Sequence, residues 1–257
     1  MYLSTNALFS LLHYIFFCAI FSHRNICLIL SAEGDFMYKV SDVAELLFYV
    51  SSLSNLLRRV KPSCFSVVVL PGLFPENPVT EAFEIAIKIN SPYLLVAGFH
   101  VDTAKRYEVF TDEIDCESCN IKLLIQDGFK DDVHNTMDQI RWLTPKINEN
   151  SIDAVVLLSQ SYHLPRAFAT LIQSFINYDY DFIPIIPVSH AISPFERILW
   201  NHERVDLKKD SPQINLFKGE FSRLDQYSSY EKLDVSTIKT IRMYGEWLNE
   251  NLNRFII

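Results

Sequence analysis

The sequence predicts an α/β domain built on a mostly parallel sheet of five strands, and three observations support this prediction. Five short apolar segments are rich in Val, Leu and Ile and do not alternate with polar residues, which is typical of strands covered on both faces. Segments with helical periodicity lie between them, and this alternation implies right-handed crossovers between parallel strands. With 257 residues, of which 49% are hydrophobic and 21% charged, the chain can also bury a substantial core.

The predicted elements begin with a helix over residues 37–59, where apolar side chains recur at three- and four-residue steps and which Pro62 ends. Strands are expected at residues 66–70, 93–97, 122–126, 153–159 and 182–187. Further helices are expected at residues 80–89, 134–147, 165–176 and 236–252. Residues 193–230 are polar and irregular, and we expect them to cover one edge of the domain.

Near the N-terminus, residues 7–21 form a nearly continuous apolar run. Its fifteen residues fall short of the roughly 20 that cross a bilayer as a helix. No Lys or Arg precedes the run, so the basic start of a secretory signal is missing. The sequence leaves three interpretations open: a buried helix, a weak membrane anchor within residues 7–30, or a loosely packed extension. Residues 1–36 are therefore assigned to an apolar extension or weak anchor and residues 37–257 to a single domain, either cytoplasmic or membrane-associated.

The net charge of −8 argues against a general nucleic-acid binder, because such a protein needs a basic face to meet phosphates. A small anionic ligand is still compatible with it, since a local pocket can be positive on an acidic protein. The chain has only six glycines, which limits the number of loops that can approach a phosphate closely. The signature motifs of esterases, nucleoside triphosphatases, dehydrogenases and metalloproteases are absent from the sequence.

The five cysteines are an odd number, and most lie in apolar surroundings, so a reducing compartment is the simplest interpretation. Cys116 and Cys119 have the spacing of half a zinc site or of a redox pair. A structural zinc site needs four ligands, and no second Cys or His pair follows at a suitable spacing. We therefore expect both thiols to lie in a polar loop without a metal.

Polar side chains gather where the predicted strands end. Four of the seven histidines lie in these loops or at the helix start that follows one of them: His100, His134, His163 and His190. In open parallel sheets, ligands bind outside the carboxyl ends of the strands. The sequence therefore places the working site at this edge, although loops also collect polar residues for other reasons.

The loop after the fourth strand carries the strongest chemical signal. Pro165 is suited to the first position of a helix, whose free N–H groups and dipole attract anions. Arg166 adds a planar fork of donors for phosphate or carboxylate, and His163 can exchange a proton or bind a metal. The alternative is structural: His163 caps the helix while Arg166 pairs with a surface acid.

A second helix start lies at residues 134–136. Asn135 is expected to cap this helix by accepting hydrogen bonds from backbone N–H groups. Asn135 and Thr136 could equally reach a ligand hydroxyl, so both belong to the candidate site.

Four segments occur in a recognisable order: Val-Val-Val-Leu-Pro-Gly at 67–72, Leu-Leu-Val-Ala-Gly-Phe at 94–99, Asn-Thr-Met-Asp-Gln at 135–139, and Ser-Tyr-His-Leu-Pro-Arg-Ala at 161–167. This order resembles the bacterial YdcF/SanA/ElyC-like family, also called the DUF218 domain, over about residues 66–190. Residues 219–227 look like a C-terminal segment of some members. The resemblance implies a Rossmann-like three-layer fold and, for several branches, a role connected with the cell envelope.

The chain departs from the family pattern at its glycine motifs. Pro71 stands where the family has Gly, Ala97 and Phe99 flank a lone Gly98, and Gln139 replaces the second Asn. Loops with fewer glycines admit a phosphate less closely. This chain can therefore differ from the family in its ligand or in its activity.

Three functional hypotheses follow. The leading one is a protein that binds a small anionic ligand, for example a nucleotide, through strand-end residues. The ligand-binding residues expected are Gly72, Gly98, Asn135, Thr136, Ser161, His163 and Arg166. The second is an enzyme acting on a phosphorylated or glycosyl-lipid envelope precursor, with His163 as general acid or base oriented by Asp127 or Asp102. The third is an interaction module that has lost its ligand. The sequence specifies no cofactor and no oligomeric state.

Overall fold

The computed structural model describes residues 40–71, 78–98, 118–127, 131, 133–190, 197–199, 210–212 and 237–257. From Glu45 onward these residues belong to one compact unit. The predictions for residues 1–36 lie outside the described residues. Within the described part of the chain, no helix is both long and apolar enough to cross a membrane.

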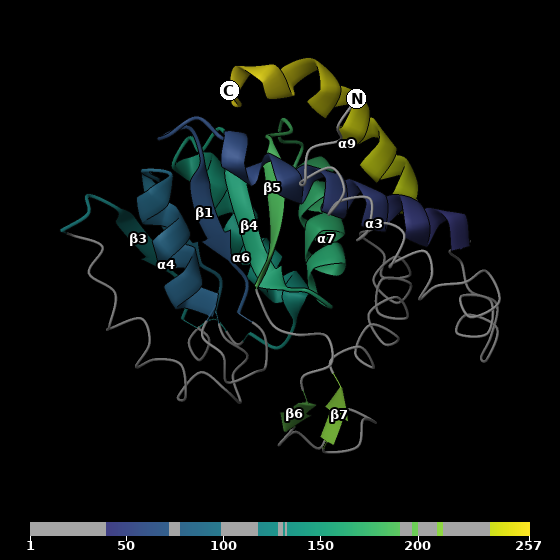
Figure 1. Cartoon of the computed structure of the whole chain (residues 1–257), viewed down its shortest axis with the longest axis horizontal. Helices are drawn as coiled ribbons and strands as arrows, with labels where there is room; N and C mark the ends of the chain where they lie inside the picture. The colour runs from purple at the N-terminus through teal and green to yellow at the C-terminus, as the bar shows by residue number, and fades with distance from the viewer. Residues whose placement is uncertain are drawn as a thin grey trace, which may run out of the picture. The chain divides into compact units, whose positions relative to one another are not determined.

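Five parallel strands form the central sheet, in the order β3-β2-β1-β4-β5 (Figure 1). Their bounds are β1 Ser66–Val69, β2 Tyr93–Val96, β3 Lys122–Ile125, β4 Val155–Gln160 and β5 Ile185–His190. All four neighbouring pairs run parallel, and this strand order is the one found in Rossmann-type sheets. The predicted fold class is therefore confirmed, and the sheet is parallel throughout.

The helices agree closely with the predicted segments. Their bounds are α3 Val40–Ser54, α4 Pro78–Lys88, α6 Thr136–Glu149, α7 Leu164–Asn177 and α9 Thr237–Asn251, with short 3-10 helices η1 Asn55–Arg59 and η2 Leu252–Arg254. A two-stranded antiparallel sheet joins β6 Arg197–Leu199 to β7 Asp210–Pro212. The expectation of irregular structure is therefore wrong for these two strands, which are too short to show a period in the sequence.

The helices cover the two faces of the sheet. Side chains of α4 pack on alternate residues of the central strands in a cluster that contains Val67, Val69, Val156 and Leu158. Helix α7 contacts β4, β5, α6 and α9. The crossovers β1–α4–β2 and β4–α7–β5 run toward opposite edges of the sheet. Because both crossovers are expected to be right-handed, α4 and α7 must lie on opposite faces, which gives the three layers.

Helix α7 is buried on nearly its whole circumference, since every residue from Leu164 to Phe175 is buried. Its polar side chains find partners on neighbouring helices: Ser174 Oγ lies 2.6 Å from Thr144 Oγ1, and Gln173 Oε1 accepts from Thr240 Oγ1 at 2.8 Å. These buried hydrogen bonds hold α7 between α6 and α9.

The beginning of β5 depends on helix α9. The strand was expected at residues 182–187 but begins only at Ile185, because Phe182 packs edge-on against the rings of Tyr244 and Trp247 outside the sheet. The Tyr244 hydroxyl accepts from Ile185 N at 2.7 Å and reaches Ile183 O at 3.3 Å. Burial raises the pKa of this hydroxyl far above its ordinary value, so it stays protonated and can donate.

The C-terminal segment also pairs with the residues that precede β1. Val60 and Ile256 form an antiparallel bridge. Lys61 N donates to Phe255 O at 2.9 Å, and Ile257 N donates to Arg59 O at 2.7 Å. Phe255 then packs edge-on against Phe65, whose side chain is fully buried.

We predict that Tyr244→Phe lowers the free energy of unfolding by about 1–3 kcal/mol, because it leaves the buried Ile185 N–H without its partner. Tyr178→Phe is the matched control, since the Tyr178 hydroxyl makes only a long, exposed bond of 3.4 Å to Arg141 O. Urea unfolding of both variants measures the difference. Equal losses would show that the Tyr244 hydroxyl does not hold β5.

Candidate functional site

The carboxyl ends of β1 and β4 form the centre of the candidate site. These two strands are neighbours, but β1 continues through α4 and β4 continues through α7, on opposite faces. Ligands of open α/β sheets bind at such a reversal of direction. The residues that connect β4 to α7 are Ser161, Tyr162 and His163, so the segment singled out in the sequence lies at this point.

Four buried side chains form a continuous polar network on the α7 face of the sheet at these strand ends. Arg166 Nη1 donates to Thr136 Oγ1 at 2.6 Å, and Thr136 Oγ1 lies 2.7 Å from His163 Nε2. His163 Nδ1 lies 3.0 Å from Ser159 Oγ, which donates to Leu70 O at 3.2 Å. The four residues are at most 7% exposed. The network therefore links the starts of α6 and α7 to the ends of β1 and β4.

The hydrogen bonds of this network indicate which ring nitrogen of His163 carries a proton. Because Ser159 gives its proton to the carbonyl of Leu70, its oxygen accepts from His163 Nδ1–H. Thr136 Oγ1 accepts from the guanidinium of Arg166 and has a second lone pair, so it can donate to Nε2 of a neutral His163 ring or accept from a charged one. The contacts therefore assign a proton to Nδ1 and leave Nε2 open. Orientation of this ring by Asp127 or Asp102 stays a prediction, since Asp102 lies outside the described residues.

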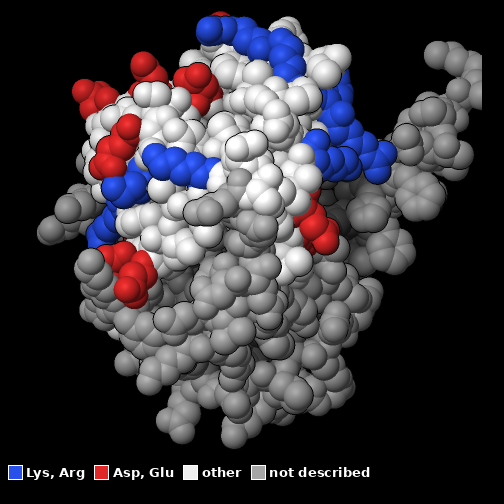
Figure 2. Space-filling model, turned by 90° about the vertical axis from the view of Figure 1, so that its left-hand side faces the viewer, with Lys and Arg blue, Asp and Glu red and all other residues white. Residues whose placement is uncertain are grey.

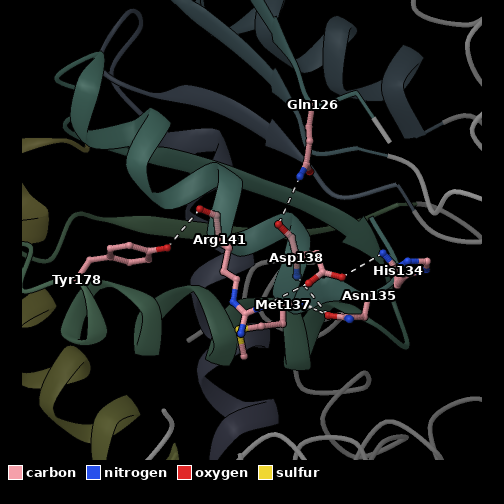
Figure 3. Close-up of polar contacts among 7 residues, drawn as sticks. All are labelled: Gln126, His134, Asn135, Met137, Asp138, Arg141 and Tyr178. Atoms are coloured by element: carbon pink, nitrogen blue, oxygen red, sulfur yellow. Dashed lines mark hydrogen bonds and ion pairs between the residues drawn. The ribbon is translucent and has the colours of Figure 1, made fainter. Parts of the chain in front are cut away.

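Asn135 caps helix α6, as predicted (Figure 3). Its Oδ1 accepts from Met137 N at 2.8 Å and from Asp138 N at 3.2 Å. Asp138 in turn accepts from His134 N at 3.1 Å and lies 3.5 Å from Arg141 Nη1. These contacts fix the first turn of α6 and place Thr136 beside His163. The side-chain oxygen of Asn135 is therefore engaged by the helix.

Gly98, at the end of β2, approaches protein atoms closely. A Cβ at this position would lie 3.0 Å from Gln126 O and 3.1 Å from Val133 Cγ2. The Gly98 N–H donates to Gln126 Oε1 at 2.8 Å, and Gly98 O accepts from Gln139 Nε2 at 2.7 Å. Both backbone groups of this glycine are thus held by glutamine side chains. Gln139 joins the site through this contact.

The remaining predicted site residues are placed as follows. Ser161 is half-buried in the turn between β4 and α7, and Gly72 lies outside the described residues. Pro165 was expected to open α7 but follows Leu164, so it is the second residue of the helix. His163 precedes the helix with no side-chain capping bond, because its ring points into the polar network instead.

A second polar group at the same edge was missed by the sequence analysis. It consists of Glu81 in the first turn of α4, Gln160 at the end of β4, and His190 at the end of β5. His190 Nδ1 contacts Glu81 Oε2, and Gln160 Oε1 accepts from the hydroxyl of Tyr162. The alternation of side chains along β4 could have indicated that Gln160 leaves the sheet on the face opposite Ser159.

Neither cysteines nor acidic clusters provide a metal site in the described part of the chain. Among those residues, no group of three His, Cys, Asp or Glu side chains could hold an ion. Cys119 is a free, half-buried thiol in a turn, and Cys116 lies outside the described residues. The prediction for this pair therefore stays a prediction.

The surface offers no simple alternative to the buried network on the side that Figure 2 presents. On its described residues, acidic and basic side chains lie interspersed, and no single sign of charge dominates (Figure 2). Arg166, by contrast, is a buried residue that brings a positive charge to the site from inside the fold.

Comparisons of the chain with protein-family models, with curated proteins and with solved structures found no match.

We predict that Thr136→Val lowers the free energy of unfolding by about 1–3 kcal/mol, because Arg166 and His163 both lose a buried hydrogen-bond partner. The same change should alter the ¹⁵N signals of the His163 ring, since Nε2 loses its hydrogen-bond partner. Thr136→Ser keeps the hydroxyl and should preserve both properties. Thr144→Val, in the same helix, provides the control: it should reduce stability and leave the His163 signals unchanged. Unaltered His163 signals in Thr136→Val would contradict a hydrogen bond between Thr136 and His163 Nε2.

Proposed function

We propose that this protein binds a small anionic ligand at the ends of β1 and β4. The observation that carries the proposal is the buried guanidinium of Arg166 in the first turn of α7, coupled by hydrogen bonds to Thr136 and His163. A phosphate or carboxylate is the expected anionic group, because its oxygens match the planar fork of the guanidinium.

The energetics of burial support this proposal. The guanidinium of Arg166 is held inside the fold, where it donates to Thr136 Oγ1. The start of α7 adds the positive end of a helix dipole at the same place. An anion at these strand ends would benefit from both fields in surroundings of low dielectric constant. The polar network keeps this charge in position before any ligand arrives.

The catalytic hypothesis receives less support from the geometry. A general base must present a ring nitrogen to the group that it deprotonates. In the described structure, His163 directs Nδ1 to Ser159 and Nε2 to Thr136. Catalysis by His163 would therefore require that Thr136 first releases Nε2. The envelope-related role rests on the family resemblance alone and stays a prediction.

The proposal is tested with inorganic phosphate and AMP as probes of the full chain, using calorimetric titration. Arg166→Ala should weaken binding of the probe by about ten- to a hundredfold, as expected for one lost charge-assisted contact. Arg166→Lys should restore only part of the affinity, because an ammonium group cannot reproduce the planar fork. Arg242→Ala is the matched control, since Arg242 pairs with Glu45 on exposed helices, and it should leave affinity unchanged.

Melting temperatures of the same variants separate binding from architecture. If Arg166→Ala stays folded and binds both probes as tightly as the wild type, the network is structural and the proposal is wrong. Failure of the wild-type protein to bind either probe would equally contradict it.

A further inference from the structure

Among the residues that the structure describes, two buried nitrogens at the edge of the sheet find no hydrogen-bond partner: Gln160 Nε2 and His190 Nε2. Gln160 is fully buried, and the side chain of His190 is 12% exposed. Buried polar atoms in folded proteins nearly always have partners, and leaving one without a partner costs about 1–3 kcal/mol. Two such atoms at this edge of the sheet therefore point to a bound group that forms a hydrogen bond with each of them.

The two residues are neighbours in the sheet. Gln160 and His190 stand opposite each other in the parallel pairing of β4 and β5. On β4, Val156 and Leu158 point into the core cluster beneath α4, and Gln160 continues this alternation. His190 contacts Glu81 from the first turn of α4, so its ring lies on the same face. Both free nitrogens thus belong to the α4 face of the strand ends.

The chemistry of the two nitrogens is complementary. If the Glu81 carboxylate accepts from His190 Nδ1, a ring that carries this single proton leaves Nε2 as an acceptor. Gln160 Oε1 accepts from the Tyr162 hydroxyl, and Nε2 is therefore the NH₂ donor. One group that donates to His190 and accepts from Gln160 satisfies both nitrogens. A hydroxyl does this, whereas a phosphate oxygen cannot donate and an ammonium cannot accept.

We infer that Gln160 and His190 form a binding subsite for an alcohol hydroxyl of a phosphorylated sugar or polyol. The hydroxyl part of this inference depends only on these two residues, while the phosphate part rests on the function proposed above. The two parts adjoin: the ring of Tyr162, whose hydroxyl holds Gln160, lies stacked with the ring of His163 at 6.3 Å between centroids. A small phosphorylated polyol could therefore reach across the edge of β4, with its phosphate toward Arg166.

Glycerol phosphate and propyl phosphate provide a matched pair of probes, because they differ only in hydroxyl groups. The wild type should bind glycerol phosphate about tenfold more tightly, which corresponds to about 1.4 kcal/mol. Gln160→Met and His190→Phe should each abolish this preference without changing the affinity for propyl phosphate. Gln173→Met is the control, since both amide atoms of this buried glutamine have partners in helices α7 and α9. It should lower the melting temperature more than Gln160→Met and retain the preference.

Histidine ¹⁵N spectra add a direct readout. In the free protein, His190 Nε2 should show the signal of an unprotonated nitrogen, and glycerol phosphate or concentrated glycerol should shift it. Equal affinities for the two phosphates, a protonated Nε2 in the free protein, or no response to any polyol would overturn the inference. Variants that only melt earlier while keeping the preference would also overturn it. Failure of the phosphate site gives a different pattern: propyl phosphate does not bind, yet glycerol still shifts His190 Nε2.

Discussion

The candidate site depends on the position of one strand, β4. The strands that follow β1 lie toward one edge of the sheet, and the strand that follows β4 lies toward the other. All six residues of β4 are buried, so each of its side chains is committed to one of two covered faces. At its end this alternation sends Ser159 toward α7 and Gln160 toward α4. One strand thus supplies both polar groups, and their separation follows from the pleat of the backbone.

Burial decides how these polar groups are organised. On the α7 face, the hydroxyls of Thr136 and Ser159 connect Arg166, His163 and the carbonyl of Leu70 in an unbroken series of contacts. On the α4 face, two nitrogens find no partner among the described residues. A completed network holds its geometry in the absence of ligand, whereas an incomplete one gains free energy when a ligand supplies the missing partner. The two faces therefore suit different tasks.

The fold could be predicted from the sequence because apolar strands covered on both faces leave a strong local signal, as in residues 66–69 and 155–160. Site residues could be predicted only where they belong to a local sequence pattern. Asn135 before helix α6 is one case, and His163 and Arg166 around the start of α7 are another. Glu81 and His190 lie 109 residues apart in the chain, and no local pattern connects them. The packing of helix α4 on the sheet brings Glu81 to His190 at the end of β5, so their contact required the three-dimensional structure.

The contacts of the C-terminal segment have a consequence for biosynthesis. The Tyr244 hydroxyl holds the start of β5, and Ile256 bridges to Val60 ahead of the first strand. Contacts between residues so distant in sequence form late, because the entropy of closing the intervening loop must be paid first. While the chain is still on the ribosome, the N–H of Ile185 therefore lacks its partner, and Phe182 lacks its aromatic neighbours. Until Tyr244 leaves the exit tunnel, this edge of the nascent sheet stays open to chaperones and to mispairing.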